Sequence, residues 1–197
     1  MEQHGQRIGL FGGSFDPPHN AHLAIAGAAV SLCHLDKLLF IPCRESPLKG
    51  RTPGAPADDR LAMLRLATSA LPWAEVCDWE LHRPGPSYSW QTVEHIARTH
   101  PGARLYWLMG EDQWSAIERW ANPDFLRQHL TFIVFARNGA VPAHREGWQH
   151  VFLPGEFPGS STEARTKLAA GNRADDLLPE AVETYAISRR LYTTGDH

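Results

Sequence analysis

A glycine-rich turn followed by two histidines is the part of the sequence best suited to chemistry. Gly12, Gly13 and Ser14 follow a short apolar run and precede a stretch rich in alanine and leucine. Glycines let backbone amides approach an anion, and the first turn of a helix adds a partial positive charge. His19 and His22 lie three residues apart at the start of that stretch, so both can face one ligand. The segment therefore predicts a phosphate site.

Other interpretations of these residues compete with a phosphate site. The spacing is neither G-x-G-x-x-G nor G-x-x-x-x-G-K-[ST], which disfavours the dinucleotide fold used for hydride transfer and the P-loop of ATPases. The two histidines alone also fit a metal pair, or partly buried histidines that pack their polar tips. A pair supplies only two ligands and no third is spaced nearby, so we expect no metal held by the protein itself. The position of the histidines behind a Gly-Gly turn favours the phosphate site.

The elements expected around this turn alternate between strands and helices. Apolar runs of strand length cover residues 7–12, 37–42, 75–79, 104–109, 130–136 and 150–153. A helical pattern covers residues 19–35, and two more helices are expected to begin at the possible caps Asp58 and Ser89. Another helical stretch follows the fourth strand as far as Trp120. Two further helices are expected over about 162–170 and 179–192. The alternation predicts a single doubly wound, Rossmann-like α/β domain over residues 1–197, with a mostly parallel sheet and a C-terminal helical portion from about residue 160. Such domains bind ligands where the strands end.

Length, charge and cysteine count limit the possible partners. The 197 residues are about one domain in length, and 43% hydrophobic residues suffice for one core. A formal charge of −3 gives no net attraction to nucleic acid or anionic lipid, so phosphate binding must be local. Three widely spaced cysteines argue against a disulfide scaffold, and no apolar run approaches the ~20 residues of a membrane span. We therefore expect a cytoplasmic protein without nucleic-acid or membrane partners, of unknown oligomeric state.

Residues 12–23, GGSFDPPHNAHL, resemble the opening motif of a known family. The motif is G-G-[ST]-F-D-P-x-H-x-G-H-L, and it belongs to the bacterial nicotinate-nucleotide adenylyltransferases of the (T/H)-x-G-H nucleotidyltransferase superfamily. Ala21 stands where the family usually has glycine. Its methyl group is the smallest side chain that narrows the approach of ATP.

Further blocks follow in the family's order along nearly the whole chain. Residues 40–49 resemble the F-[IV]-P…P-P-H-K loop, with Leu48 in place of the histidine. The remaining blocks are similar to the R-x-x-M-L helix (59–64), the R-x-G-x-S-Y-T-x-x-T-L substrate loop (83–93), the G-x-D…W element (110–120), the I-S-S-T-x-I-R motif (159–165) and the closing helix (178–192). So many blocks in the family's order are hard to attribute to chance.

The resemblance implies transfer of AMP from ATP to nicotinate mononucleotide, which gives deamido-NAD and pyrophosphate in NAD biosynthesis. The attacking phosphate is already anionic at neutral pH, so the reaction needs neither a general base nor a covalent intermediate. The difficulty is to bring two anions together and to stabilise charge on the leaving pyrophosphate. The resemblance also implies Mg²⁺ as cofactor, held mainly through the phosphates of ATP.

Site residues are carried over from the motifs that match. The expected catalytic residues are His19, His22, Lys49 and Arg165. The expected ATP-binding residues are Gly12, Gly13, Ser14, Phe15, His19, His22, Asp112, Ser160, Ser161, Thr162 and Arg165. The expected mononucleotide-binding residues are Lys49, Ser87, Tyr88, Ser89 and Trp120. In this assignment His22 donates a hydrogen bond to a phosphate oxygen as charge shifts in the transition state, and His19 holds the phosphates of ATP beside it.

Structural roles remain open for some of these residues. Residues 160–162 fit an ordinary helix cap as well as a phosphate grip, and Asp112 fits a cap as well as a ribose contact. Trp120 fits a core position on an apolar helix face as well as a stacking partner for pyridine. Asp16 is expected to brace the turn rather than to bind metal.

Three other functions compete with the one implied. An enzyme of the same superfamily that prefers nicotinamide mononucleotide would share every motif, because acid and amide differ by one charge. Pantetheine-phosphate adenylyltransferase would share the first and last motifs but not the Ser-Tyr-Ser loop with Asp112 and Trp120. A nucleotide sensor without catalysis would be expected to lack His22, Lys49 or Arg165, and all three are present.

Overall fold

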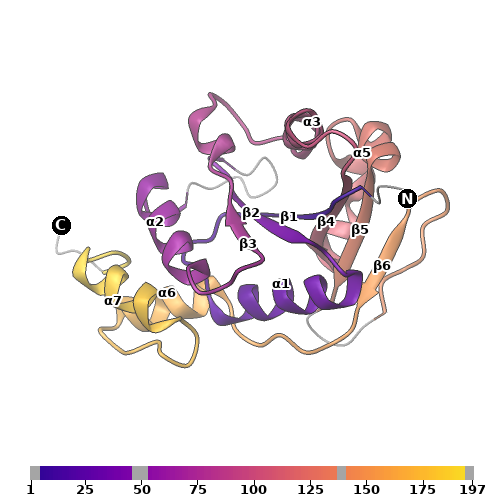
Figure 1. Ribbon diagram of the computed structural model, residues 1–197. Helices are drawn as coiled ribbons and strands as arrows, with labels where there is room; N and C mark the ends of the chain where they lie inside the picture. The colour runs from indigo at the N-terminus through magenta and orange to yellow at the C-terminus, as the bar shows by residue number, and fades with distance from the viewer. Residues whose placement is uncertain (1–4, 46–52, 137–140, 194–197) are drawn as a thin grey trace.

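The computed structural model describes residues 5–45, 53–136 and 141–193, and its centre is a six-stranded sheet (Figure 1). The strands are β1 Arg7–Gly13, β2 Lys37–Pro42, β3 Ala74–Val76, β4 Arg104–Gly110, β5 Leu130–Phe135 and β6 His150–Leu153. They lie in the order β3-β2-β1-β4-β5-β6, and every neighbouring pair is parallel. This is the strand order of a doubly wound, Rossmann-like fold, so the predicted fold class is confirmed.

Helices cover both faces of the sheet. They are α1 Asn20–Cys33, α2 Ala57–Thr68, α3 Ser89–Thr99, α4 Glu111–Ser115, α5 Pro123–His129, α6 Ser161–Ala169 and α7 Glu180–Ser188, with short 3₁₀ turns η1 Trp79–His82 and η2 Ile117–Arg119. Figure 1 shows α1 along one face and α3 and α5 across the other, while α2, α6 and α7 gather beside the start of α1.

Alternation along the buried strands fills two cores, one on each face of the sheet. On β1, Ile8 and Leu10 pack with Trp107 and Phe132 in the core beneath α3 and α5. Phe11 instead packs in the core beneath α1. Successive side chains of a strand point to opposite faces, so one apolar run can serve both cores. A third cluster joins α2, α6 and α7, which places the C-terminal helices against the molecule rather than apart from it.

The element boundaries differ from the sequence predictions at several places. The third strand was predicted over 75–79, but it ends at Val76 and the chain turns into η1 at Trp79. The pattern predicted as helical up to Trp120 divides into α4 and η2, and α5 was not predicted. The α5 helix begins with Pro123, which fixes φ for the first helical turn, after Asn122 in the left-handed region.

The predicted caps and the predicted chain end also need correction. The N-cap of α2 is Pro56 with Asp58 in the first turn, and the N-cap of α3 is Tyr88 with Ser89 as its first residue. The last helix was predicted over 179–192, but α7 ends at Ser188. Arg190 and Tyr192 then adopt positive φ, which no continuing α-helix allows.

Candidate active site

Two pockets adjoin where β1 and β4 end, the point at which the strand order reverses. Ligands of doubly wound sheets bind at this switch point. One pocket, of about 400 Å³, contains His19 and His22 and is called here the histidine pocket. The other, of about 310 Å³, contains Trp107 and Trp120 and is called the tryptophan pocket. Both are lined by residues 12–14, the glycine turn, so one molecule in each pocket would meet at that turn.

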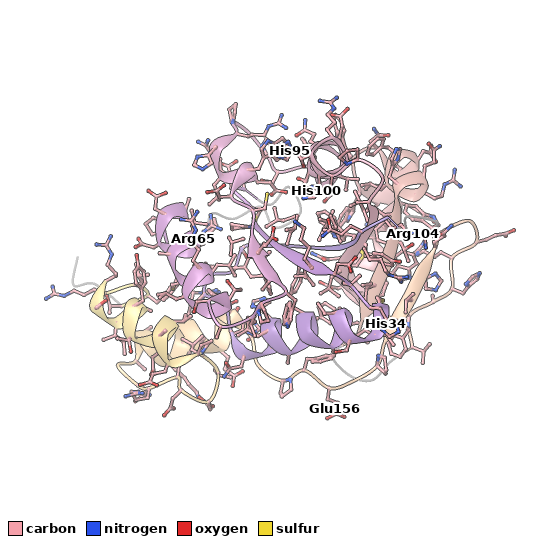
Figure 2. The ribbon with its side chains drawn as sticks, in the orientation of Figure 1. His34, Arg65, His95, His100, Arg104 and Glu156 are labelled. Atoms are coloured by element: carbon pink, nitrogen blue, oxygen red, sulfur yellow. The ribbon has the colours of Figure 1, made fainter. Side chains whose placement is uncertain are left out.

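Neither pocket reaches the other end of the sheet. Figure 2 marks that end by His34, which follows the last turn of α1, and by Arg104, which begins β4. Histidine and arginine side chains there are remote from the carboxyl ends of the strands, so they belong to neither pocket.

A buried carboxylate fixes the chain just after the glycine turn. The side chain of Asp16 is almost fully buried and accepts hydrogen bonds from the backbone amides of Gly54 at 2.7 Å and Ala55 at 2.9 Å. It also accepts one from the hydroxyl of Tyr192 at 2.9 Å. Burial is the main cause that raises the pKa of Tyr192, and the Asp16 charge adds to it, so this hydroxyl stays a donor. Asp16 therefore braces the turn, as expected from the sequence.

The start of α1 orients the two histidines. His19 is the N-cap residue, and its backbone N–H donates to Nδ1 of His22 at 3.2 Å. The two rings stack with centroids 3.7 Å apart, and the rings of His22 and Phe15 meet edge to face with centroids 5.0 Å apart. Because Nδ1 of His22 accepts a hydrogen bond, the proton of the neutral ring belongs on Nε2. His22 therefore presents an N–H donor from a fixed ring in the histidine pocket.

The start of α6 also lines the histidine pocket. Ser160 caps the helix, since its Oγ accepts from the backbone N–H of Glu163 at 3.1 Å, and Ser161 donates to the carbonyl of Pro17 at 2.9 Å. Arg165 donates to the carbonyl of Asp16 at 2.7 Å and to Thr162 Oγ1 at 3.1 Å. The cap and the pocket wall are thus the same residues, because Ser160, Ser161, Thr162 and Arg165 all line this pocket.

The other expected ATP-binding residues reach the same pocket. Phe15 and Asp112 line it, and Asp112 lies in the first turn of α4, whose N-cap is Gly110. The alternative role of Asp112 as a helix cap is therefore wrong. Ala21 is buried and lines the pocket as well, so the methyl group in place of the family's glycine forms part of its wall.

Aromatic side chains form the tryptophan pocket. The rings of Trp107 on β4 and Trp120, the residue after η2, meet edge to face with centroids 6.0 Å apart. Ser87, Tyr88 and Ser89 line the pocket from the start of α3. Trp120 packs against the core, which is one of the two roles considered for it, and it also lines the tryptophan pocket. Its stacking on pyridine stays a prediction. No functional role was predicted for Trp107, since a tryptophan within an apolar strand is indistinguishable in sequence from a core residue.

A buried glutamate that the sequence analysis also missed holds the start of α3. Glu80 of η1 is 5% exposed, lines the tryptophan pocket and accepts a hydrogen bond from Thr92 Oγ1. Burial raises the pKa of Glu80, while hydrogen bonds from Thr92 and Ser87 oppose that rise. Ser87 Oγ in turn accepts from the backbone N–H of Arg44 at 3.1 Å. The sequence offered one signal for Glu80, namely that it lies three residues before Arg83, where the substrate-loop motif begins.

Some expectations concern residues outside the described part of the chain, or a metal site or membrane span. Lys49 and Leu48 lie outside the described residues. Within residues 5–45, 53–136 and 141–193, no three histidines, cysteines, aspartates or glutamates gather closely enough to hold a metal ion. Over the same ranges no helix has the length and apolar character needed to cross a membrane.

Known proteins resemble this chain in sequence and in fold. Its sequence matches the cytidylyltransferase-like family over residues 10–167. It is 37% identical to a probable nicotinate-nucleotide adenylyltransferase of Methylacidiphilum infernorum, over 94% of this chain and 92% of that protein. It is 36% identical to the probable enzyme of the same name from Halalkalibacterium halodurans, over 97% of this chain and 93% of that one.

The fold is similar to that of Plasmodium falciparum nicotinic acid mononucleotide adenylyltransferase complexed with NaAD, with a TM-score of 0.76 at 21% identity over 95% of this chain and 97% of that one. The same enzyme complexed with APC gives a TM-score of 0.74 at the same identity and coverage. At this identity the likeness concerns the fold. The sequence matches confirm the resemblance of the motifs: the chain belongs to the cytidylyltransferase-like nucleotidyltransferases and, within them, to the nicotinate-nucleotide adenylyltransferase family.

Proposed function

We propose that this chain transfers AMP from ATP to nicotinate mononucleotide, forming deamido-NAD and releasing pyrophosphate. The observation that carries the proposal is the pair of pockets that adjoin at the glycine turn, one polar and one walled by tryptophans. Two nucleotides bound there would bring their phosphates together at the turn. The names of the relatives and the NaAD complex of a structural neighbour support this choice of substrates.

ATP fits the histidine pocket by its charges. The glycine turn and the first turn of α6 both line it and offer backbone amides, and the guanidinium of Arg165 adds a fixed positive charge. His22 adds the Nε2–H donor. Donors that are already oriented stabilise developing negative charge without reorganising during the reaction. These groups therefore suit a triphosphate that is losing its pyrophosphate.

Nicotinate mononucleotide fits the tryptophan pocket. Its phosphate oxygen would form a bond to the α-phosphorus of ATP while the bond from that phosphorus to the bridging oxygen breaks and pyrophosphate leaves. This geometry requires the phosphate at the glycine turn and the pyridine ring farther in, against Trp120. Ser89 begins α3, and the first amides of a helix have no carbonyl partner within it, so they suit the ring carboxylate.

Mg²⁺ would neutralise charge on the triphosphate when bound. The donor set fits an ion held largely by phosphate and water, since the two carboxylates that line the histidine pocket among the described residues differ in availability. Asp16 is occupied by Gly54, Ala55 and Tyr192, whereas Asp112 is exposed. Asp112 is therefore the described residue suited to contact such an ion or its waters.

A cytoplasmic location stays a prediction.

The experiment is a coupled assay with ATP, Mg²⁺ and one acceptor at a time: nicotinate mononucleotide, nicotinamide mononucleotide or phosphopantetheine. Pyrophosphate and dinucleotide are measured together. We expect equimolar products and the highest kcat/KM with nicotinate mononucleotide. A higher kcat/KM with the amide or with phosphopantetheine would replace the proposed acceptor, and no pyrophosphate with any acceptor would overturn adenylyl transfer.

A further inference from the structure

Arg119 is the one cationic side chain among the described residues that line the tryptophan pocket. It is the last residue of η2 and directly precedes Trp120. Neither the phosphate chemistry described above nor the motif assignment gives it a role. Its position beside the proposed pyridine subsite raises the question of which anion it meets there.

The charge of Arg119 is not neutralised within the described part of the chain. Neighbouring arginines are paired: Arg145 with Glu118 at 2.8 Å and Arg127 with Asp124 at 3.0 Å. For Arg119, the ranges 5–45, 53–136 and 141–193 supply no carboxylate within 4 Å and no hydrogen-bond acceptor. The guanidinium is exposed at the pocket and available to a ligand.

The layout of the two pockets decides which end of a mononucleotide lies near Arg119. The phosphate has to reach the glycine turn, which both pockets share. Arg119 and Trp120 line the tryptophan pocket but not the histidine pocket, so they lie away from the histidines and the start of α6. The group that meets Arg119 is therefore on the ring rather than on the ribose phosphate.

We propose that Arg119 is a specificity-determining residue that pairs with the ring carboxylate of nicotinate mononucleotide and so favours the acid over the amide. The inference rests on the proposed function and specifies how its acceptor is chosen. A guanidinium binds a carboxylate through two parallel N–H···O bonds, which a neutral carboxamide cannot accept in the same way.

The one carboxylate among the described residues that line the pocket works against the acid. Glu80 repels a ring carboxylate when it is ionised, but its burial raises its pKa and its oxygens are engaged by hydroxyl groups. Arg119 carries a full charge at neutral pH whatever the state of Glu80. Because Arg119 is exposed, water screens part of its attraction for the ring carboxylate. We therefore expect the acid to be preferred over the amide by about 10-fold, which is at the lower end of the range for a hydrogen bond to a charged group.

The test compares acid and amide in wild type, Arg119→Gln, Arg119→Lys and the control Arg127→Gln. Arg127 is a similarly exposed arginine paired with Asp124, and it lines neither pocket. The first readout is the ratio of kcat/KM for acid over amide. The second is the ratio of their dissociation constants, measured by tryptophan fluorescence in the absence of ATP. We expect Arg119→Gln to lower both ratios about 10-fold, Arg119→Lys to keep part of the preference, and Arg127→Gln to change neither ratio.

An unchanged ratio in Arg119→Gln would overturn the proposal, and so would an equal loss for acid and amide, since that would place Arg119 on a group both ligands share. The binding ratio keeps this inference separate from the proposed function. If the wild type forms no dinucleotide with either ligand, the proposed function is overturned, and the dissociation constants still decide whether Arg119 selects the acid.

Discussion

The histidine pocket and the tryptophan pocket adjoin at the glycine turn but are assembled differently. The histidine pocket is held by hydrogen bonds between distant parts of the chain, with Asp16 tied to Ala55 and Tyr192 and its carbonyl tied to Arg165. The tryptophan pocket is held mainly by aromatic packing of Trp107 against Trp120. Substitutions in the histidine pocket should therefore affect charge stabilisation and the binding of ATP. Substitutions in the tryptophan pocket should affect only the binding of the acceptor.

The largest effect is expected for His22→Ala, which removes the oriented Nε2–H donor of the histidine pocket. Loss of one such donor lowers kcat by about 10²- to 10³-fold. We expect the same loss with acid and amide, because both meet the same α-phosphorus. The matched control is His144→Ala, at an exposed histidine that lines neither pocket. A variant that melts far below the wild type yet keeps its specific activity would make His22 a structural residue.

Arg165→Ala should have the next largest effect on activity. It removes a guanidinium that lines the histidine pocket and donates to the carbonyl of Asp16. We expect KM for ATP to rise about 10- to 100-fold, as for a lost hydrogen bond to a charged group, and KM for the mononucleotide to stay close to that of the wild type. Steady-state kinetics with each substrate varied in turn separates the two. An unchanged KM for ATP would remove Arg165 from the triphosphate site.

Trp120→Ala tests the assignment of the tryptophan pocket to the mononucleotide. Stacking of a base on an aromatic side chain contributes ~1–3 kcal/mol, so we expect KM for the mononucleotide to rise about 10-fold. Trp120→Phe keeps an aromatic face and should retain most of the affinity. If KM for ATP rises instead, the two pockets have been assigned to the wrong substrates.

Tyr192→Phe probes how the histidine pocket is braced. Removing the donor to buried Asp16 should lower the free energy of unfolding by about 1–3 kcal/mol, measured by denaturant titration. Tyr185→Phe is a matched control, because Tyr185 donates to another buried carboxylate, Asp59, at 2.9 Å. Both variants should lose stability, but only Tyr192→Phe should also raise KM for ATP. Equal KM values in the two variants would show that the brace does not reach the site.

Glu80→Gln should have the smallest effect, visible in its pH dependence. Burial raises the pKa of Glu80, so the folded protein binds this proton more tightly than the unfolded chain. Its contribution to stability is therefore greatest below the unfolded pKa and is lost as pH rises through the folded value. Relative to wild type, Glu80→Gln should gain stability as pH rises across that window. A difference that does not vary with pH would contradict the raised pKa.

The two pockets also differ in how far they could be predicted from the sequence. The histidine pocket is built from contiguous motifs, and each of the expected ATP-binding residues lines it. Most strands were also predicted, because buried parallel strands are short apolar runs. The tryptophan pocket was predicted only in part. Trp107 looks like a core residue and Arg119 like a solvated surface charge, until the sheet order brings the ends of β1 and β4 together.

Local chemistry explains the remaining differences. The third strand ends early because the chain turns to bury Glu80 against Thr92, a contact between segments that periodicity does not reveal. The helix caps were misplaced by one or two residues, because Pro56 and Tyr88 occupy cap positions without the side-chain oxygen that a cap usually supplies.

A crystal structure with deamido-NAD would show directly which pocket holds which half of the dinucleotide. We expect the adenosine half in the histidine pocket, the pyridine ring against Trp120, and the bridging phosphates at the glycine turn with Nε2 of His22 donating to one of them. A dinucleotide bound in the reverse direction, or one whose phosphates lie away from both His22 and the start of α6, would contradict this arrangement.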